Sequence, residues 1–317
     1  MESSLFSTHQ LFLAGLNQKD VARQVRAGEL VQVRRGFYRP RADLTPVDRH
    51  RLLVQATVPT LKPGAVLSHA SAGVLHGLPV PYAALKRVWV TRSRRGNGHV
   101  SKHVIERGCP LPDADVTVID GLSVTSLPRT VADLARLLRA DWAVAVADAA
   151  LRNGVSKHDL VASIEAARRR RGNARAGFVL DFADPRSESP GESRSRVILA
   201  QGGLPAPTLQ REVWGDVGLV GRTDFAWEDD GVLGEFDGHI KYGAHRRPGE
   251  SVGDAVAREK LREDDLRSLE WGVVRWVWDE LDHPRDLVAK VRKALANGKG
   301  RPPASEPTAS TPLGWAS

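Results

Sequence analysis

The chain begins with two short helical patterns, and the second is the clearer of the two. Over residues 18–27, Val21 and Val25 lie one helical turn apart, so both face the same side of an amphipathic helix. Asn17 precedes this pattern as an N-cap, and Gly28 comes after it as a stop. The pattern predicts a helix that packs on a small core through its two valines.

Two short strand patterns come directly after this helix. They lie at residues 30–33 and 37–39, and two arginines and a glycine at 34–36 form the turn between them. Helix, turn, helix and hairpin in this order are typical of a winged helix-turn-helix domain. We place this domain at residues 1–55.

The next segment, residues 56–182, mixes strand and helix patterns. Apolar runs at 116–119 and 122–125 flank Asp120-Gly121, a dipeptide that favours a hairpin turn. Three helical patterns come next, at about 129–139, 141–152 and 156–171. The segment therefore predicts an α/β middle domain.

A polar linker with proline and glycine, residues 183–191, separates this region from a third one. Beyond it the patterns have the order α-β-β-β-α-β. The helices are expected at about 191–201 and 254–269, the strands near 208–214, 219–227, 232–237 and 272–278, and a last short helix at 284–296. This order resembles that of a restriction-endonuclease-like domain, and we place the third domain at 183–297. The tail, 298–317, is low in apolar residues and expected to be disordered. The predicted fold class is multidomain α+β.

The charge of the 317 residues is divided unevenly along the chain. Residues 1–180 contain 27 Lys and Arg against 14 Asp and Glu, whereas residues 181–317 contain 19 against 24. A basic front favours contact with phosphates, because Lys and Arg displace condensed counterions. The acidic back favours a cluster of carboxylates. The two parts are therefore expected to perform separate tasks.

Several classes of protein are excluded by simpler features. Cys109 is the only cysteine, which excludes an internal disulfide and a cysteine-rich zinc site. The longest apolar candidate, Ala143–Leu151, is too short to span a bilayer and contains Asp148. The first residues lack the order of a secretory signal. We expect a cytoplasmic protein without a membrane partner.

Basic side chains are spaced along the second helix and its hairpin as in a DNA reader. Lys19, Arg23 and Arg26 share one stripe of the helix, while Arg34 and Arg35 lie at the tip of the hairpin. A recognition helix reaches into the major groove, and a wing offers cations to flanking phosphates. The alternative is a solvated basic face on a small helical domain. We predict DNA contact because helix stripe, glycine stop and basic hairpin occur together in this order.

Acidic side chains oppose one another in the third region. Asp224 lies on one predicted strand, and Glu235 and Asp237 share a face of the next. Asp224 lies opposite Glu235 or Asp237, depending on which residues form the loop, and both registers remain open. Opposed acids destabilise a sheet, and carboxylates bind hard cations. The pattern predicts a Mg²⁺ or Mn²⁺ site rather than a solvent-facing charged hairpin.

The front of the chain resembles a known family. The segment GLNQKDVARQVRAGELVQVRRGFYR is similar to the N-terminal winged helix of AbiEi-type antitoxins from type IV toxin–antitoxin modules. The segments LSHASAGVLHGLPV and VIDGLSVTSLPRTVADLA are similar to the region after that winged helix in many actinobacterial chains, so the resemblance covers about residues 5–175. It implies a DNA-binding repressor of its own operon and, as partner, a separately encoded nucleotidyltransferase toxin.

The back resembles a second family, the PD-(D/E)XK nucleases, and among them the very-short-patch-repair-like endonucleases. The similar segments are GRTDFAW, EFDG and REKLREDDLRSLEWGVVRWVWDEL, within residues 187–282. The resemblance implies that Asp224 and Glu235 hold Mg²⁺, with Asp237 as a third acid. Glu192 matches an acid that some branches carry on the first helix.

One departure from this nuclease pattern leaves two interpretations open. The pattern has a lysine two positions after Glu235, where this chain has Asp237. Lys241 either steadies the attacking water, completing a catalytic set with Asp224 and Glu235, or is a solvated lysine. The chain is accordingly either a Mg²⁺-dependent DNA endonuclease or a transcriptional repressor or antitoxin whose nuclease-fold domain is inactive.

Overall fold

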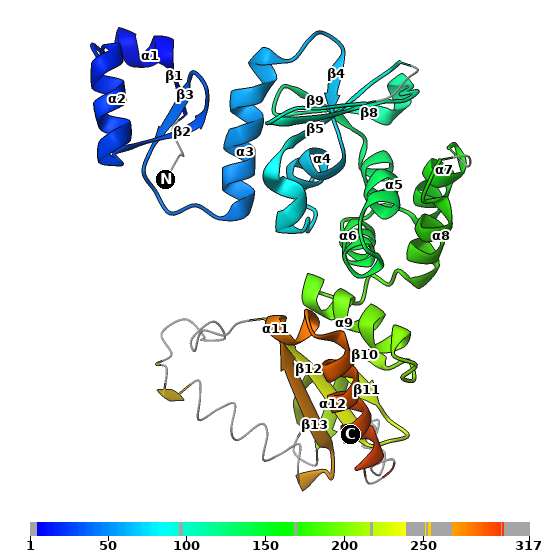
Figure 1. The fold of residues 1–317 in the computed structure, drawn as a ribbon. Coiled ribbons are helices and arrows are strands. Elements are labelled where there is room, and N and C mark those ends of the chain that lie inside the picture. The colour runs from blue at the N-terminus through cyan, green and yellow to red at the C-terminus, as the bar shows by residue number, and fades with distance from the viewer. Residues whose placement is uncertain are drawn as a thin grey trace, which may run out of the picture. The chain divides into compact units, whose positions relative to one another are not determined.

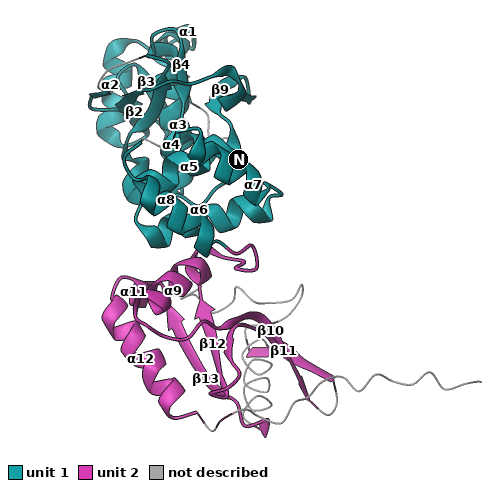
Figure 2. Cartoon of the chain, turned by 90° about the vertical axis from the view of Figure 1, so that its right-hand side faces the viewer, with its two compact units in different colours: residues 1–183 teal, residues 184–317 magenta. Residues whose placement is uncertain are grey.

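The computed structural model describes most of the chain as an α+β protein with three sheets among the described residues (Figure 1). The described residues are 5–94, 98–167, 170–215, 218–238, 251, 253–254, 268–298 and 300. The chain divides into two compact units, residues 1–183 and 184–317 (Figure 2).

The N-terminal unit opens with two helices and a small sheet of three strands in the order β1-β3-β2. The elements are β1 (Phe6–Ser7), α1 (Thr8–Leu13), α2 (Gln18–Ala27), β2 (Leu30–Arg34) and β3 (Phe37–Pro40). The side chain of Asn17 caps α2 by accepting the backbone N–H of Lys19 and Asp20, and Gly28 ends the helix with φ +73°. Val21 is buried with Leu11 and Leu30. The predicted helix, its caps and the hairpin are confirmed.

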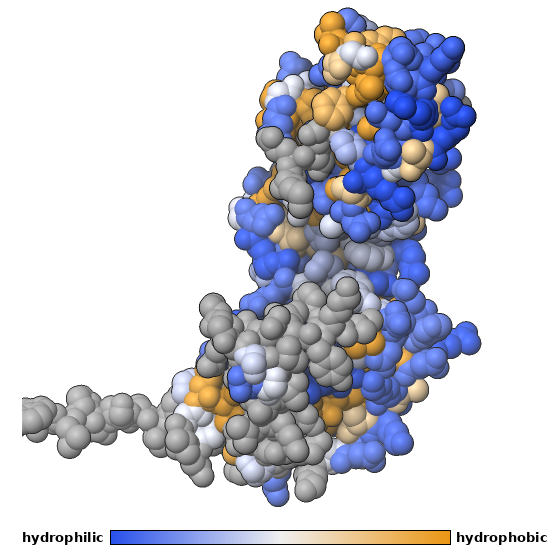
Figure 3. All heavy atoms as spheres, turned by 90° about the vertical axis from the view of Figure 1, so that its left-hand side faces the viewer, coloured by the Kyte–Doolittle hydropathy of each residue, from blue (hydrophilic) through white to orange (hydrophobic). Residues whose placement is uncertain are grey.

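The second part of this unit contains a six-stranded sheet in the order β6-β7-β5-β4-β9-β8. Its strands are β4 (Ala65–Leu67), β5 (Val88–Arg92), β6 (His99–Val100), β7 (Val104–Gly108), β8 (Val116–Ile119) and β9 (Leu122–Thr125). The helices beside it are α3 (Pro46–Thr57) and α4 (His69–Leu75), with short 3-10 helices at Val58–Thr60, Tyr82–Lys86 and Asp113–Asp115. The hairpin predicted around Asp120-Gly121 is present as β8 and β9. Figure 3 shows one side of the molecule, where most of the described surface of this unit is hydrophilic.

Four helices complete the N-terminal unit. They are α5 (Leu127–Leu137), α6 (Ala140–Arg152), α7 (Lys157–Glu165) and α8 (Asn173–Phe182). The helix expected at 156–171 is confirmed only in its first part, because α7 ends at Glu165. The helix α8 was not predicted. It begins after Gly172, which has φ +93°, a left-handed conformation that glycine adopts without steric cost.

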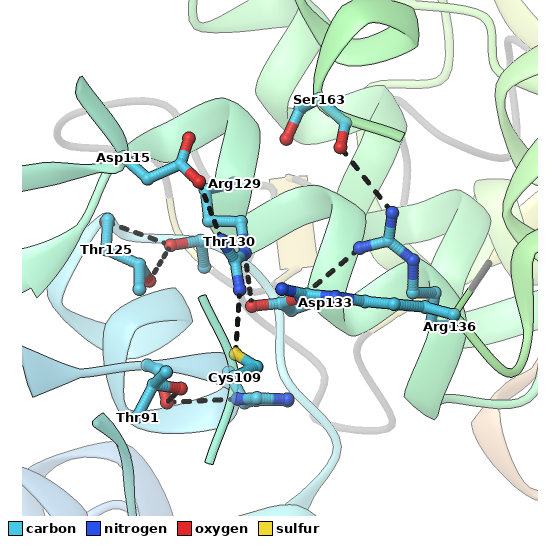
Figure 4. A network of polar contacts seen from close by, with 12 residues as sticks. Thr91, Cys109, Asp115, Thr125, Arg129, Thr130, Asp133, Arg136 and Ser163 are labelled. Carbon is cyan, nitrogen blue, oxygen red and sulfur yellow. Dashed lines mark hydrogen bonds and ion pairs between the residues drawn. The ribbon is translucent and has the colours of Figure 1, made fainter. Parts of the chain in front are cut away.

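A network of charged side chains is buried in this unit around α5 (Figure 4). Asp133, with 3% of its surface exposed, accepts hydrogen bonds from three arginines. The donors are Arg129 at 2.9 Å, Arg136 at 3.2 Å and Arg170 at 3.2 Å. Burial by itself would raise the pKa of Asp133, but the surrounding positive charges outweigh it and hold the pKa below its ordinary value. The carboxylate is therefore ionised and binds α5 to the chain beyond α7.

Arg129 extends the network towards the sheet. Its guanidinium donates to Asp115 at 2.6 Å and to the Sγ of Cys109 at 3.2 Å, as well as to Asp133. Arg129 is itself 3% exposed. A buried ion of this kind is tolerated only with its partners in place, so loss of a partner is expected to destabilise this unit.

The C-terminal unit is a four-stranded sheet with helices packed on it. Its elements are α9 (Pro190–Gln201), β10 (Thr208–Gly215), β11 (Gly218–Trp227), β12 (Val232–Asp237), β13 (Gly272–Val277), α11 (Trp278–Leu281) and α12 (Pro284–Ala296). The strand order is β10-β11-β12-β13, with only the last pair parallel. The predicted strands are confirmed to within one residue. Most of the helix expected at 254–269, and the tail beyond residue 300, lie outside the described residues.

The sheet of this unit is covered on both faces. On one face Phe225 and Trp276 pack with apolar side chains of α9 and α12, and the indole N–H of Trp276 donates to the Oγ of Ser195 at 2.7 Å. On the other face Ala226 belongs to a second apolar cluster.

Within the described part of the chain, no helix combines the length and the apolar character that crossing a membrane requires.

Candidate functional site

The register of β11 and β12 brings two of the predicted acids together. Phe225 pairs with Gly234, and the two following pairs keep the same register. Carried one residue further, it sets Asp224 opposite Glu235, which is the first of the two registers that the sequence left open. The backbone N–H of Phe236 donates to the Oδ2 of Asp224 at 2.8 Å, so the carboxylate is held at the β12 edge of its strand.

A further predicted acid, Glu192, lies in the first turn of α9. Ser189 caps this helix through a hydrogen bond from the backbone N–H of Glu192 at 3.2 Å. The side chain is 6% exposed. Its Oε2 accepts the backbone N–H of Glu188 at 2.8 Å and the side-chain amide of Gln210 at 2.9 Å. Glu192 is thus a buried carboxylate whose oxygen is held by two donors.

The surroundings of Asp224 raise its pKa. Burial, the charge of Glu192 and the charge of Glu235 together raise the pKa of Asp224 to about 7, against the lowering effect of hydrogen bonds from Phe236 and Gln210. Such an arrangement of like charges suits a divalent cation, which would remove the repulsion. Carboxylate oxygens are the donors that Mg²⁺ and Mn²⁺ prefer, so the donor chemistry of these side chains is the kind that the predicted metal would need.

The acids are nevertheless not arranged as a finished ligand set. Glu235 accepts a hydrogen bond from the Nε of Arg275 at 2.8 Å, across the parallel pairing of β12 and β13. Among the described residues no three carboxylate, imidazole or thiol groups converge on one point. Asp237 is exposed at the end of β12. Lys241 lies outside the described residues, so its predicted role stays a prediction.

Two residues of this site were not predicted from the sequence, Gln210 on β10 and Arg275 on β13. Residues 209 and 211 pair with Phe225 and Thr223, so Gln210 lies opposite Asp224. Gln210, Asp224, Glu235 and Arg275 therefore form one line across all four strands. The pairing of β12 with β13 joins segments some 40 residues apart. The local sequence therefore does not predict the contact between Arg275 and Glu235.

The basic residues predicted to bind DNA lie in the first part of the N-terminal unit. Lys19, Arg23 and Arg26 are all exposed on α2, although Arg23 also pairs with Asp20 at 3.1 Å. At the hairpin tip, Arg35 is exposed.

Arg34, which was expected to share this tip, is oriented differently. It is only partly exposed, and its guanidinium donates to the Oγ1 of Thr57 at the end of α3, at 3.0 Å. The structure therefore leaves four of the five predicted cations on the surface, and contact of all five with DNA stays a prediction.

Comparison with known proteins bears on the front of the chain. Residues 1–41 match the family model described as "Transcriptional regulator, AbiEi antitoxin". The chain is also 34% identical over 179 residues to the uncharacterized proteins MT2308 and Rv2248 of two Mycobacterium tuberculosis strains, a stretch that is 56% of this chain and 63% of each relative. The N-terminal region is thus antitoxin-like, as predicted. The family match ends at residue 41 and does not include the C-terminal unit.

Proposed function

We propose that this chain is a DNA-binding protein whose C-terminal unit hydrolyses DNA phosphodiesters with Mg²⁺ or Mn²⁺. The observation that carries the proposal is the meeting of acids around Asp224, which the register of β11 and β12 sets opposite Glu235. Burial, together with the charges of Glu192 and Glu235, raises the pKa of Asp224 to about 7. A protein keeps partly buried acids this close mainly where a cation gathers their charge. The order of α9 and the four strands also agrees with the α-β-β-β-α-β pattern of PD-(D/E)XK nucleases.

Each residue of the site has a distinct task in this proposal. Glu192, Asp224 and Glu235 would hold the metal, with Asp237 as a further acid at the end of β12. The bound metal would polarise the phosphate and lower the pKa of a water molecule. Arg275 places a positive charge beside Glu235. The PD-(D/E)XK pattern has a lysine at the position of Asp237, so Arg275 is a cation near the place where that lysine would lie. Lys241 remains a candidate for steadying the attacking water.

The experiment that tests this proposal is a Mn²⁺ titration of the full chain by calorimetry, with nicking of plasmid DNA followed in parallel. We expect the wild-type chain to bind Mn²⁺ and to nick, and the double variant Asp224→Ala/Glu235→Ala to do neither. The matched control is Asp229→Ala/Asp230→Ala, which removes two acids from the turn of the same hairpin and should leave both properties unchanged. Absence of Mn²⁺ binding in the wild type contradicts the metal site.

A second candidate function is that of a transcriptional repressor or antitoxin with an inactive C-terminal unit. It is favoured by the family match at residues 1–41 and by the ion pair between Arg275 and Glu235, which occupies one of the acids. In this case a separately encoded toxin would be a partner, as the resemblance to AbiEi-type antitoxins implies. Mn²⁺ binding without nicking in the same titration would favour this second function.

DNA binding by the N-terminal unit is common to both functions and leads to a separate prediction. The double variant Arg23→Ala/Arg26→Ala is expected to bind DNA more weakly, with the slope of log K against log salt reduced by about 2, because each lost phosphate contact removes about one unit. Fluorescence anisotropy with a labelled duplex at several salt concentrations measures this. The control Arg152→Ala/Lys157→Ala removes the same charge from exposed positions on α6 and α7. Equal slopes in both variants would refute the assignment of α2.

A further inference from the structure

His69, the first residue of α4, contacts the six-stranded sheet of the N-terminal unit. Its ring stacks on the indole of Trp89 on β5, with the two ring centroids 5.1 Å apart. The guanidinium of Arg107 on β7 lies over the same indole, 5.6 Å from its centroid. Arg107 pairs with Thr91, two residues after Trp89, so these three side chains share one face of the sheet. An imidazole and a cation therefore contact one tryptophan.

Hydrogen bonds fix which ring nitrogen of His69 carries the hydrogen. The hydroxyl of Thr91 donates to the Oγ of Ser68 at 2.9 Å, and this Oγ lies 3.0 Å from the Nδ1 of His69. Ser68 is fully buried, so its own hydroxyl hydrogen needs an acceptor. Within the described residues that acceptor is Nδ1. A neutral ring of His69 therefore carries its hydrogen on Nε2.

The surroundings of His69 keep this ring neutral. Burial lowers its pKa most, and the charges of Arg107, Arg129 and Arg170 lower it further, against the opposing charge of Asp133. In the part of the chain that the structure describes, the Nε2 of His69 has no hydrogen-bond partner. The ring thus presents one N–H donor that no protein group uses.

The cations around His69 differ in how far their charge is neutralised. Arg129 and Arg170 both donate to the carboxylate of Asp133, at 2.9 and 3.2 Å (Figure 4). Arg107, in contrast, is exposed, and no carboxylate among the described residues pairs with it. Its guanidinium keeps its N–H donors and its positive charge available to a ligand.

Of the described groups around Trp89, those without a partner are hydrogen-bond donors. They are the guanidinium of Arg107 and the Nε2–H of His69. Donors beside uncompensated positive charge bind a ligand that offers acceptor oxygens and negative charge. A guanidinium takes two oxygens of an anion in its fork. A carboxylate then has no oxygen left for the imidazole, whereas a phosphate has a third.

We propose that Arg107 and His69 form a binding site for the terminal phosphate of a small phosphomonoester. Arg107 holds two of its oxygens, and the Nε2–H of His69 donates to the third. His69 is only partly exposed. A terminal phosphate projects from its molecule and reaches such a group, whereas a phosphodiester of a DNA backbone carries a sugar on either side. This site belongs to the N-terminal unit and is independent of the proposed hydrolysis.

The test is calorimetry of the full chain with glycerol 3-phosphate as the probe, at about pH 8, where its phosphate is dianionic. We expect a dissociation constant below about 1 mM. In Arg107→Ala it should rise by about 10-fold or more, because hydrogen bonds to charged groups contribute at least that factor. Arg107→Lys keeps the charge but loses the fork, so its affinity should lie between the two.

The matched control is Arg87→Ala. Arg87 is exposed just before β5, so this variant removes the same charge from a neighbouring part of the sheet. Its affinity for glycerol 3-phosphate should equal that of the wild type. Glycerol, which has no phosphate, should bind to none of these proteins, and inorganic phosphate should compete with glycerol 3-phosphate.

Nuclear magnetic resonance of the histidine rings tests the part played by His69. Its signal is identified by its loss in His69→Gln and should show the hydrogen on Nε2. Glycerol 3-phosphate should shift this signal in the wild type and in Arg87→Ala, but much less in Arg107→Ala at the same concentration. A signal that does not move on saturation of the wild type overturns the role of His69.

The remaining outcomes decide the site as a whole. No binding of glycerol 3-phosphate to the wild type, or equal affinity in Arg107→Ala, overturns the proposal. Binding of inorganic phosphate without glycerol 3-phosphate shows a site for a free anion and overturns the phosphomonoester. If Arg107→Ala weakens binding of a labelled DNA duplex while the affinity for glycerol 3-phosphate stays the same, Arg107 is a contact to the DNA backbone and the proposal is wrong.

Discussion

Replacing Asp133 with leucine is expected to lower the free energy of unfolding by about 3–5 kcal/mol, a large share of the roughly 5–15 kcal/mol typical of a whole domain. The reason is the environment of its carboxylate. Arg129 and Arg136 are nearly buried beside it, with 4% and 6% of their side chains exposed, and Arg170 also donates to it. Without Asp133, positive charges remain in the interior without this counter-charge. Urea unfolding of the full chain, followed by circular dichroism, measures the loss.

The control for this prediction is an ion pair at the surface. Arg94→Ala removes the 2.7 Å contact with Glu106, where the arginine side chain is 46% exposed. Exposed pairs contribute less than about 1 kcal/mol, so this variant should unfold almost as the wild type does. If Asp133→Leu also costs less than about 1 kcal/mol, the buried network does not determine the packing of α5.

The second large effect is expected at the acids of the C-terminal unit, and it depends on pH. The pKa of Asp224 is raised to about 7 from its ordinary value of 3.8, so the folded state holds this proton more tightly than the unfolded state does. Between about pH 4 and pH 7 the wild-type chain therefore loses stability as the pH rises. An asparagine in place of Asp224 cannot ionise, but it can still accept the N–H of Phe236. We expect Asp224→Asn to be more stable than the wild type by about 2 kcal/mol at about pH 8 without metal.

Urea unfolding in EDTA, at intervals from about pH 4 to about pH 8, measures this effect as the difference between variant and wild type. The difference should be small near the lower limit, grow up to about pH 7 and stay constant above it. Saturating Mn²⁺ should reduce or reverse the difference, because metal binding stabilises the wild-type fold. A difference that does not vary with pH would mean that Asp224 ionises normally, and would remove the main support for a metal site.

Much of the secondary structure of this protein is specified locally. The helix α2 was predictable because the side chain of Asn17 satisfies its first N–H groups and Gly28 can adopt the left-handed conformation that ends it. The strands of the C-terminal unit were predictable because their apolar runs end at turn residues. The end of α7 at Glu165, before the predicted end at residue 171, and the separate helix α8 were not predicted from the sequence.

The candidate site divides in the same way. The alternation within the hairpin predicted which face Asp224 and Glu235 share, because the period of a strand is two residues. The contacts of Gln210 and Arg275 with these acids required the pairing of β10 with β11 and of β12 with β13. The local sequence does not predict the left-handed backbone of Gln210, because the surrounding structure imposes that conformation.

The sequence by itself thus determined the antitoxin-like N-terminal region, the order of the strands along the C-terminal unit and the candidate acids on those strands, but not which acid lies opposite Asp224. These features depend on residues close together in the chain, because such residues determine the local backbone conformation. Only the tertiary structure decided that Asp133 gathers three arginines, that Arg34 turns to Thr57 and that Arg275 occupies Glu235. Such contacts join distant segments, and they are selected by the packing and charge of the folded interior rather than by the local pattern.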